Sequence, residues 1–215
     1  MTPQLIDKIF DIIVNLISAL LIFVIPLLFY YIFSKVSFKS YFTRSKRTVV
    51  PDRNYFKIGW KPNGVDRFKE FQAEGYFAIA WPEVGDLTEL VSKNDDIIRD
   101  AVRHKLINSI QNKTTLGQVA GYFVRFLNIK KGDIVVTSRE NRLYMYTVKK
   151  SYYYSEENER NHTSHRIEID KKSEVIIPFS EPLNISPKFK RVTQNRLTII
   201  SLNDYASQID MLLEK

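Results

Sequence analysis

Histidines, tryptophans and clustered tyrosines are the residues of this chain with the widest capacity for chemistry. His162 and His165 lie in "HTSH", a pattern that suggests a metal site. Because the chain has no cysteine and only His104 besides, such a site would need carboxylates, from Glu156, Glu157 or Glu159. We therefore expect no metal, and we interpret His165 as a strand residue that is hydrogen-bonded at the edge of a site.

Two short motifs bear on catalysis. "IEIDKK" contains the acid-x-lysine of metal-dependent nucleases, but the sequence lacks the upstream acidic residue that those enzymes place on a neighbouring strand. "KKGD" lacks the glycine spacing and the following helix of a phosphate-binding loop. The absence of cysteine also excludes a thiol nucleophile. The sequence thus predicts neither an enzyme nor a cofactor.

The stretch "GYFAIAWPEVGDLTEL" places Trp81 and Asp86 where an apolar strand becomes a turn. Trp81 is either a core residue at the end of that strand or a wall of a pocket, whereas Ala78 and Ile79 are expected in the core. The three tyrosines at 152–154 must alternate between the faces of a strand, so at most two of them can share a pocket.

The hydrophobic pattern predicts the elements that position these residues. Strands are expected at 55–60, 77–81, 165–170 and 196–202, and a hairpin with its turn at Arg139 to Arg142. Helices are expected at 65–76 with Gly75 as its stop, at 86–106, and at 114–129 with Thr114 or Thr115 as N-cap. Residues 178–191 are interpreted as a proline-rich loop. The order indicates an α+β fold, a small mixed β-barrel with helices over its openings, in a domain spanning residues 48–215.

Residues 12–33 contain no charged side chain. A helix of that length reaches roughly 33 Å, which matches the roughly 30 Å hydrocarbon core of a bilayer. We predict one transmembrane helix in a segment of residues 1–47, because the apolar run is too long for a cleaved signal peptide. Lys8 alone precedes the span and five basic residues follow it closely, so the expected location is the inner membrane, with the N-terminus outside and the C-terminal domain in the cytoplasm.

Polar, small and kinking residues within this span suggest helix contacts. Asn15, Ser18 and Ala19 are candidates for contacts between helices of a homo-oligomer, and Pro26 can kink the helix. The alternative is a plain anchor. Residues 1–47 carry half of the net charge of +8, so the remaining charge is low for binding a long duplex.

In order and spacing, several segments resemble the N-terminal domain of Mrr-like restriction proteins, part of the PUA and EVE-like superfamily. The matching segments are "AIAW" (78–81), "GDL" (85–87), "GDIVV" (132–136), "YMYTV" (144–148), "YYY" (152–154) and "HR" (165–166). Ala80 and Tyr146 stand where glycine is common in that family, and no nuclease domain follows.

This resemblance implies a mixed barrel that binds nucleic acid or single nucleobases in an aromatic pocket. Stacking is worth roughly 1 to 3 kcal/mol per base. The implied stacking residues are Trp81, Tyr144, Tyr152 and Tyr154. Asp86 would accept from a base amine, His165 would lie at the site edge, and Arg139 or Arg166 would pair with phosphate.

The resemblance and the predicted span together suggest a membrane-anchored effector of antiphage defence. Its cytosolic domain would sense a nucleotide or oligonucleotide, and its helices would assemble in the lipid bilayer to disrupt it. The alternative is a membrane-tethered module that binds modified DNA or RNA and recruits a separate nuclease.

Overall fold

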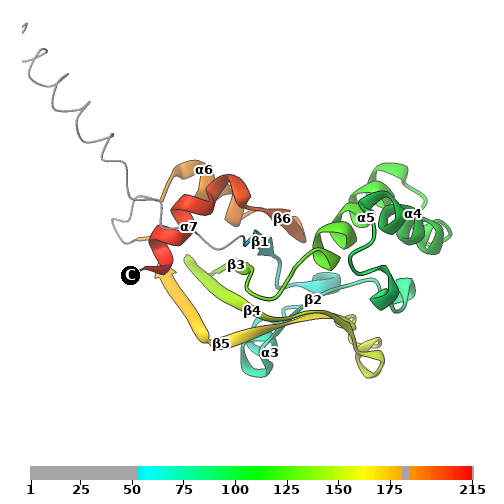
Figure 1. The fold of residues 1–215 in the computed structure, drawn as a ribbon, viewed down its shortest axis with the longest axis horizontal. Helices are drawn as coiled ribbons and strands as arrows, with labels where there is room; N and C mark the ends of the chain where they lie inside the picture. The colour runs from blue at the N-terminus through cyan, green and yellow to red at the C-terminus, as the bar shows by residue number, and fades with distance from the viewer. Residues whose placement is uncertain (1–52, 181–184, 215) are drawn as a thin grey trace, which may run out of the picture. The chain divides into compact units, whose positions relative to one another are not determined.

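A six-stranded mixed sheet forms the centre of the structure, a computed structural model that describes residues 53–180 and 185–214. The strand order is β2-β5-β4-β3-β1-β6, and only β1 and β3 run parallel. The sheet curls into an open half-barrel (Figure 1). The bounds are Tyr55–Ile58 (β1), Tyr76–Ile79 (β2), Ile134–Arg139 (β3), Arg142–Tyr154 (β4), His165–Pro178 (β5) and Ile199–Ser201 (β6).

The predicted transmembrane segment, with Asn15, Ser18, Ala19 and Pro26, lies outside the described residues. In the part of the chain that the structure does describe, no helix is both long and apolar enough to cross a bilayer.

The hairpin between β3 and β4 confirms the predicted turn. Arg139 pairs with Arg142 across it. Glu140 and Asn141 have φ of 50° and 58°, and positive φ at both central residues is the geometry that matches the twist of a two-residue hairpin. Further along β4 the register with β5 shifts at three places, which bends both long strands.

Five α-helices accompany the sheet in the described residues: Phe68–Glu74 (α3), Asp95–Leu106 (α4), Lys113–Leu127 (α5), Pro187–Thr193 (α6) and Ala206–Leu213 (α7). Short 3-10 turns lie at Pro62–Gly64, Pro82–Val84, Thr88–Leu90, Glu156–Asn158 and Asn203–Tyr205. α4 and α5 lie side by side at one end of the sheet, and α6 and α7 lie at the other (Figure 1).

The helix boundaries confirm some predictions and correct others. Gly75 ends α3 in the left-handed conformation at φ 79°, as expected. The predicted N-cap of α5 is wrong: the side chain of Asn112 accepts from the backbone N–H groups of Thr114 and Thr115. Part of the expected 178–191 loop is helical, because Pro187 occupies the first turn of α6 and Ser186 caps it.

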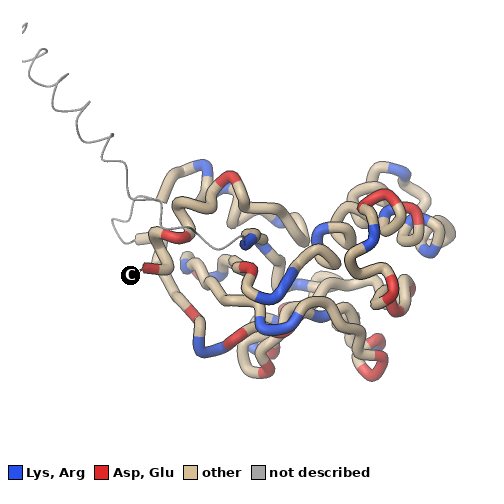
Figure 2. The backbone as a smooth tube through the Cα atoms, in the orientation of Figure 1, with Lys and Arg blue, Asp and Glu red and all other residues tan. Residues whose placement is uncertain are grey.

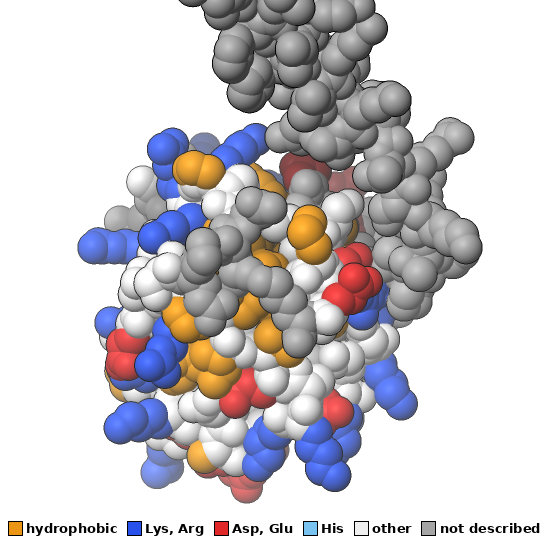
Figure 3. All heavy atoms as spheres, turned by 90° about the vertical axis from the view of Figure 1, so that its left-hand side faces the viewer, with side chains coloured by type: hydrophobic (Ala, Val, Ile, Leu, Met, Phe, Trp, Pro, Cys, Tyr) orange, Lys and Arg blue, Asp and Glu red, His pale blue; other side chains and the backbone are white. Residues whose placement is uncertain are grey.

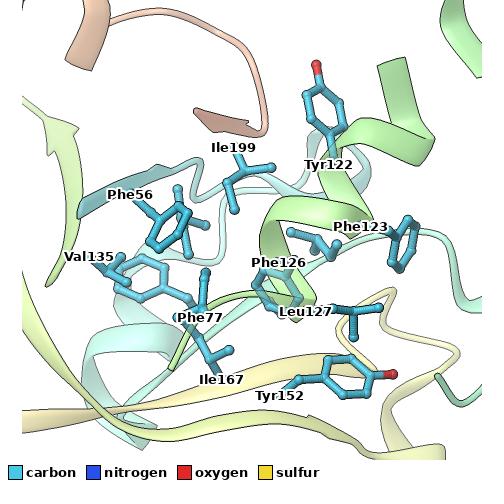
Figure 4. Close-up of a cluster of buried hydrophobic side chains, with 14 of the residues drawn as sticks. Phe56, Phe77, Tyr122, Phe123, Phe126, Leu127, Val135, Tyr152, Ile167 and Ile199 are labelled. Carbon is cyan, nitrogen blue, oxygen red and sulfur yellow. The ribbon is translucent and has the colours of Figure 1, made fainter. Parts of the chain in front are cut away.

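Two hydrophobic cores stabilise the domain. The larger core packs α3, α4 and α5 against the sheet, and Figure 4 shows part of it, with Phe126 of α5 near Tyr152. Ala78 and Ile79 are fully buried in it, as predicted. The smaller core packs Phe189 of α6 and helix α7 onto the sheet. Figure 3 views this end, where hydrophobic side chains are exposed among Lys, Arg, Asp and Glu side chains.

Candidate functional site

A pocket of about 520 Å³ lies where β1 ends. We call it the β1 pocket. Its walls come from β1 and the following turn, from the end of β3, and from residues 193–198. Three cationic residues line it, Lys57, Lys61 and Arg196, and none of the described lining residues is acidic. The pocket therefore suits an anionic ligand.

Lys57 is the most unusual residue of this pocket, because it is a lysine only 4% exposed within an otherwise apolar strand. Its ammonium donates to the carbonyl of Leu197. No carboxylate among the described residues pairs with it. Burial lowers the pKa of Lys57 to about 8. A buried cation without a counter-charge is costly, and an anionic ligand would compensate it.

Thr137 contributes a second unsatisfied group. It is 0% exposed and lines the β1 pocket, and its hydroxyl oxygen has no hydrogen-bond partner among the described residues. Leaving a buried polar group unpaired costs about 1 to 3 kcal/mol. The hydroxyl therefore has unused hydrogen-bonding capacity beneath the wall of the pocket.

Trp60 supplies an aromatic wall to the same pocket. Its indole N–H donates to the carbonyl of Ser138 over 2.8 Å, which fixes the ring. The ammonium of Lys61 lies 4.4 Å from the ring centroid. Because Lys61 is exposed, its ammonium can turn away from the ring toward a bound phosphate.

Arg139 and Tyr144, two of the predicted ligand-binding residues, lie together beside Phe68. The Arg139 guanidinium is 5.0 Å from the Phe68 ring and forms an ion pair of 3.1 Å with Asp66. Tyr144 is buried, with its ring centroid 4.8 Å from that of Phe68. The structure thus gives both residues partners within the protein, and neither lines the β1 pocket.

A second pocket of about 540 Å³ adjoins the first and shares Lys61, Pro62, Gly64 and Thr198 with it. The half-buried Trp81 lines this second pocket, as do Glu83 and His162. Of the predicted ligand-binding residues, Trp81 alone is among the described residues that line these two pockets.

The carbonyl of Trp81 ends a buried chain of three hydrogen bonds, which we call the relay. The Leu87 N–H donates to the Tyr152 hydroxyl at 3.2 Å. Tyr152 and Nδ1 of His165 are 3.0 Å apart, and Nε2 of His165 is 3.0 Å from the Trp81 carbonyl. The carbonyl can only accept, so Nε2 carries the proton and Nδ1 accepts from Tyr152. The polar side chains of the relay are thus satisfied within the protein.

Burial sets the protonation state of the relay. His165 is 0% exposed, and desolvation lowers its pKa to about 4. Trp81 holds a left-handed backbone at φ 73°, a conformation that costs a residue with a side chain about 1 to 3 kcal/mol. The hydrogen bond from His165 to the Trp81 carbonyl helps to hold that backbone. His165, which was predicted to lie at the edge of a site, therefore positions the turn at residues 81–86.

Tyr154 and Asp86 border the relay. The ring centroids of Tyr154 and His165 are 5.1 Å apart, and the Tyr154 hydroxyl donates to Glu159. Asp86 is exposed, and its carboxylate accepts from the Thr88 N–H over 2.8 Å. The structure therefore gathers Trp81, Tyr152, Tyr154 and His165, with Asp86 beside them.

Arg166 points away from this group, since it follows His165 on β5. Its guanidinium lies 3.8 Å from the centroid of the Tyr76 ring and donates to the Thr163 carbonyl over 2.7 Å. Arg166 is buried in these contacts.

Sequence reasoning missed Lys57, Trp60 and Thr137. A lysine inside "YFKIGW" is a signal that could have pointed to the β1 pocket, because such strands are otherwise apolar. The described residues hold no group of three potential metal ligands. No protein-family model matches the chain, and a search of curated proteins finds no relative.

Proposed function

We propose that this domain binds a nucleotide or a short oligonucleotide in the β1 pocket. The single observation that carries the proposal is Lys57, a buried cation with no carboxylate partner among the described residues, in a pocket lined by cations alone among charged groups. Trp60 offers the aromatic surface that a base requires for stacking. The Thr137 hydroxyl offers a hydrogen bond to the edge of a base.

The negatively charged phosphate of the ligand is the counter-charge for Lys57. Arg196, which lines the same pocket, is a second cation that can pair with it. A phosphate beside the ammonium raises its pKa above 8, so binding takes up a proton near that pH. Affinity therefore falls as the pH rises above about 8, because deprotonation then competes with binding.

Calorimetric titration of the full chain with ribonucleoside monophosphates and a cyclic dinucleotide tests the proposal. We expect saturable binding that Lys57→Met abolishes, with the free energy of unfolding unchanged or higher, because a buried unpaired charge is removed. Lys172→Met removes an equal but exposed charge and serves as the control. The proposal fails if no compound binds, or if both variants lose affinity equally.

The predicted transmembrane helix suggests what ligand binding would cause. Ligand binding favours an oligomer whose helices assemble in the bilayer and disrupt it, as part of defence against phage. A variant lacking residues 1–47 should then bind the ligand normally but no longer depolarise cells. If it protects cells as well as the full chain does, the effector role is wrong. A steep loss of affinity with salt would instead favour capture of a longer nucleic acid and recruitment of a nuclease.

A further inference from the structure

A small hollow of about 230 Å³ lies on α5 and shares no lining residue with either pocket described above. Its lining includes Arg99 of α4, Gly121, Tyr122 and Arg125 of α5, and Ile199 of β6. We call it the arginine hollow. Figure 2 shows basic positions on both helices.

Two guanidinium groups converge on one point of the arginine hollow. A Cβ atom added to Gly121 would lie 3.4 Å from Nη1 of Arg125 and 3.8 Å from Nη1 of Arg99. One turn earlier, a Cβ on Gly117 would lie 3.9 Å from Nη2 of Arg103. The guanidinium groups of three arginines therefore pack over the two glycines.

These guanidinium groups have few direct partners among the described residues. Arg99 has no hydrogen bond or ion pair with the described residues, and Arg125 donates only to the Gly121 carbonyl of its own helix, over 2.9 Å. Arg103 approaches Asp100 at 3.5 Å, but that carboxylate is 77% exposed. Like charges so close together repel each other, and an anion between them would reverse that cost.

We propose that the arginine hollow binds a phosphate group. Guanidinium groups match phosphate oxygens with paired, charge-assisted hydrogen bonds. Arg99 and Arg125 would hold the phosphate from two helices, and the absence of a side chain at Gly121 lets both guanidinium groups approach the same point of the hollow. This site is separate from the β1 pocket and does not depend on the function proposed there.

Titration of the full chain with inorganic phosphate tests the site in the absence of any base. We expect saturable binding that weakens about tenfold or more in Arg99→Gln and in Arg125→Gln, the effect of removing one charge-assisted hydrogen-bonding partner. Arg160→Gln removes an equal charge from an exposed residue elsewhere and should leave the binding unchanged.

Gly121→Ala changes the room beside the two guanidinium groups without removing either charge. The added methyl occupies the point between the two guanidinium groups, while alanine favours the helix. We expect weaker phosphate binding without loss of thermal stability. The proposal is overturned if the wild-type chain shows no saturable binding, or if Arg160→Gln weakens it as much as Arg99→Gln does.

The phosphate can come from solution or from a nucleotide, and competition distinguishes these sources. If AMP displaces inorganic phosphate and adenosine does not, the hollow accepts the phosphate of a nucleotide. If neither compound displaces it, the hollow binds free phosphate. Both results support the site, whereas equal displacement by adenosine contradicts it, because adenosine carries no phosphate.

Discussion

Two short segments of this protein share a pattern but differ in how their polar groups are satisfied. "YFKIGWKPNG" (55–64) and "YFAIAWPEVG" (76–85) each form a four-residue strand, then a tryptophan, then a 3-10 turn that begins with proline. Beside Trp60, the described part of the chain offers neither a partner for the Thr137 hydroxyl nor a carboxylate for Lys57. Beside Trp81, the relay satisfies its own donors and acceptors. A similar local sequence therefore lines a pocket with unpaired polar groups in one place and forms a hydrogen-bonded turn in the other.

The largest effect expected from this contrast is the pH dependence of stability at the relay. His165 has a pKa of about 4 in the folded state, against an ordinary value of 6.5, so the unfolded chain binds its proton first. The free energy of unfolding should fall by about 3 kcal/mol as the pH drops from 6.5 to 4. Urea denaturation across this range measures it. The side chain of His165→Gln cannot titrate, so the free energy of unfolding of this variant should lack this pH dependence. If the free energy of unfolding changes equally with pH in both proteins, His165 does not titrate as proposed.

The next effect compares the two tryptophans directly. Trp60→Ala should weaken nucleotide binding by about 10- to 100-fold, which corresponds to the loss of one stacked base. Trp81→Ala should reduce the free energy of unfolding while changing that affinity less than about threefold, because its ring packs on Tyr122 and Phe123. Calorimetric titration with the nucleotide measures the affinity of both variants. A greater loss of affinity in Trp81→Ala than in Trp60→Ala would place the ligand beside Trp81 and not beside Trp60.

The smallest effect is expected at Asp86. Asp86→Ala removes the hydrogen bond to the Thr88 N–H and should lower the free energy of unfolding by about 0.5 to 1 kcal/mol. Asp86→Asn retains an oxygen that can accept this hydrogen bond, so most of the free energy of unfolding should be kept. Affinity for the nucleotide should stay unchanged in both variants, and a clear loss in Asp86→Asn would place this carboxylate at the ligand.

The local parts of the fold were predictable from the sequence because their signals are local. The Arg139 to Arg142 turn, the Gly75 stop and the apolar face of α5 each depend on residues close together in the chain. The cap of α5 was misplaced because asparagine and threonine both suit that position, and only the backbone geometry distinguishes them. α7 carries no charge signal at its ends and was missed.

The candidate site was harder to predict, because satisfaction of a polar group depends on contacts distant in sequence. Tyr152, Trp81 and His165 were grouped as ligand-binding residues, and they do lie together. However, the Tyr152 and His165 side chains bind each other, His165 also binds the Trp81 carbonyl, and the Trp81 ring packs on Tyr122 and Phe123. Thr137 in "IVVT" looks like an ordinary strand residue, since nothing nearby in the sequence indicates that its hydroxyl will lack a partner. Residue type identified the chemistry available, whereas packing determined which groups remain unpaired.

A matched pair of hydroxyl deletions tests the central claim most directly. Thr137→Val and Tyr152→Phe each remove one buried hydroxyl with little change of shape, and both nucleotide affinity and the free energy of unfolding are measured. We predict that Thr137→Val weakens binding about tenfold and leaves the stability unchanged or higher, because its hydroxyl has no partner within residues 53–180 and 185–214. Tyr152→Phe should lower the stability by about 1 to 2 kcal/mol, with unchanged affinity, because the Leu87 N–H and His165 lose a partner. The opposite result, with Thr137→Val less stable and binding normally, would contradict the assignment of the β1 pocket as the ligand site.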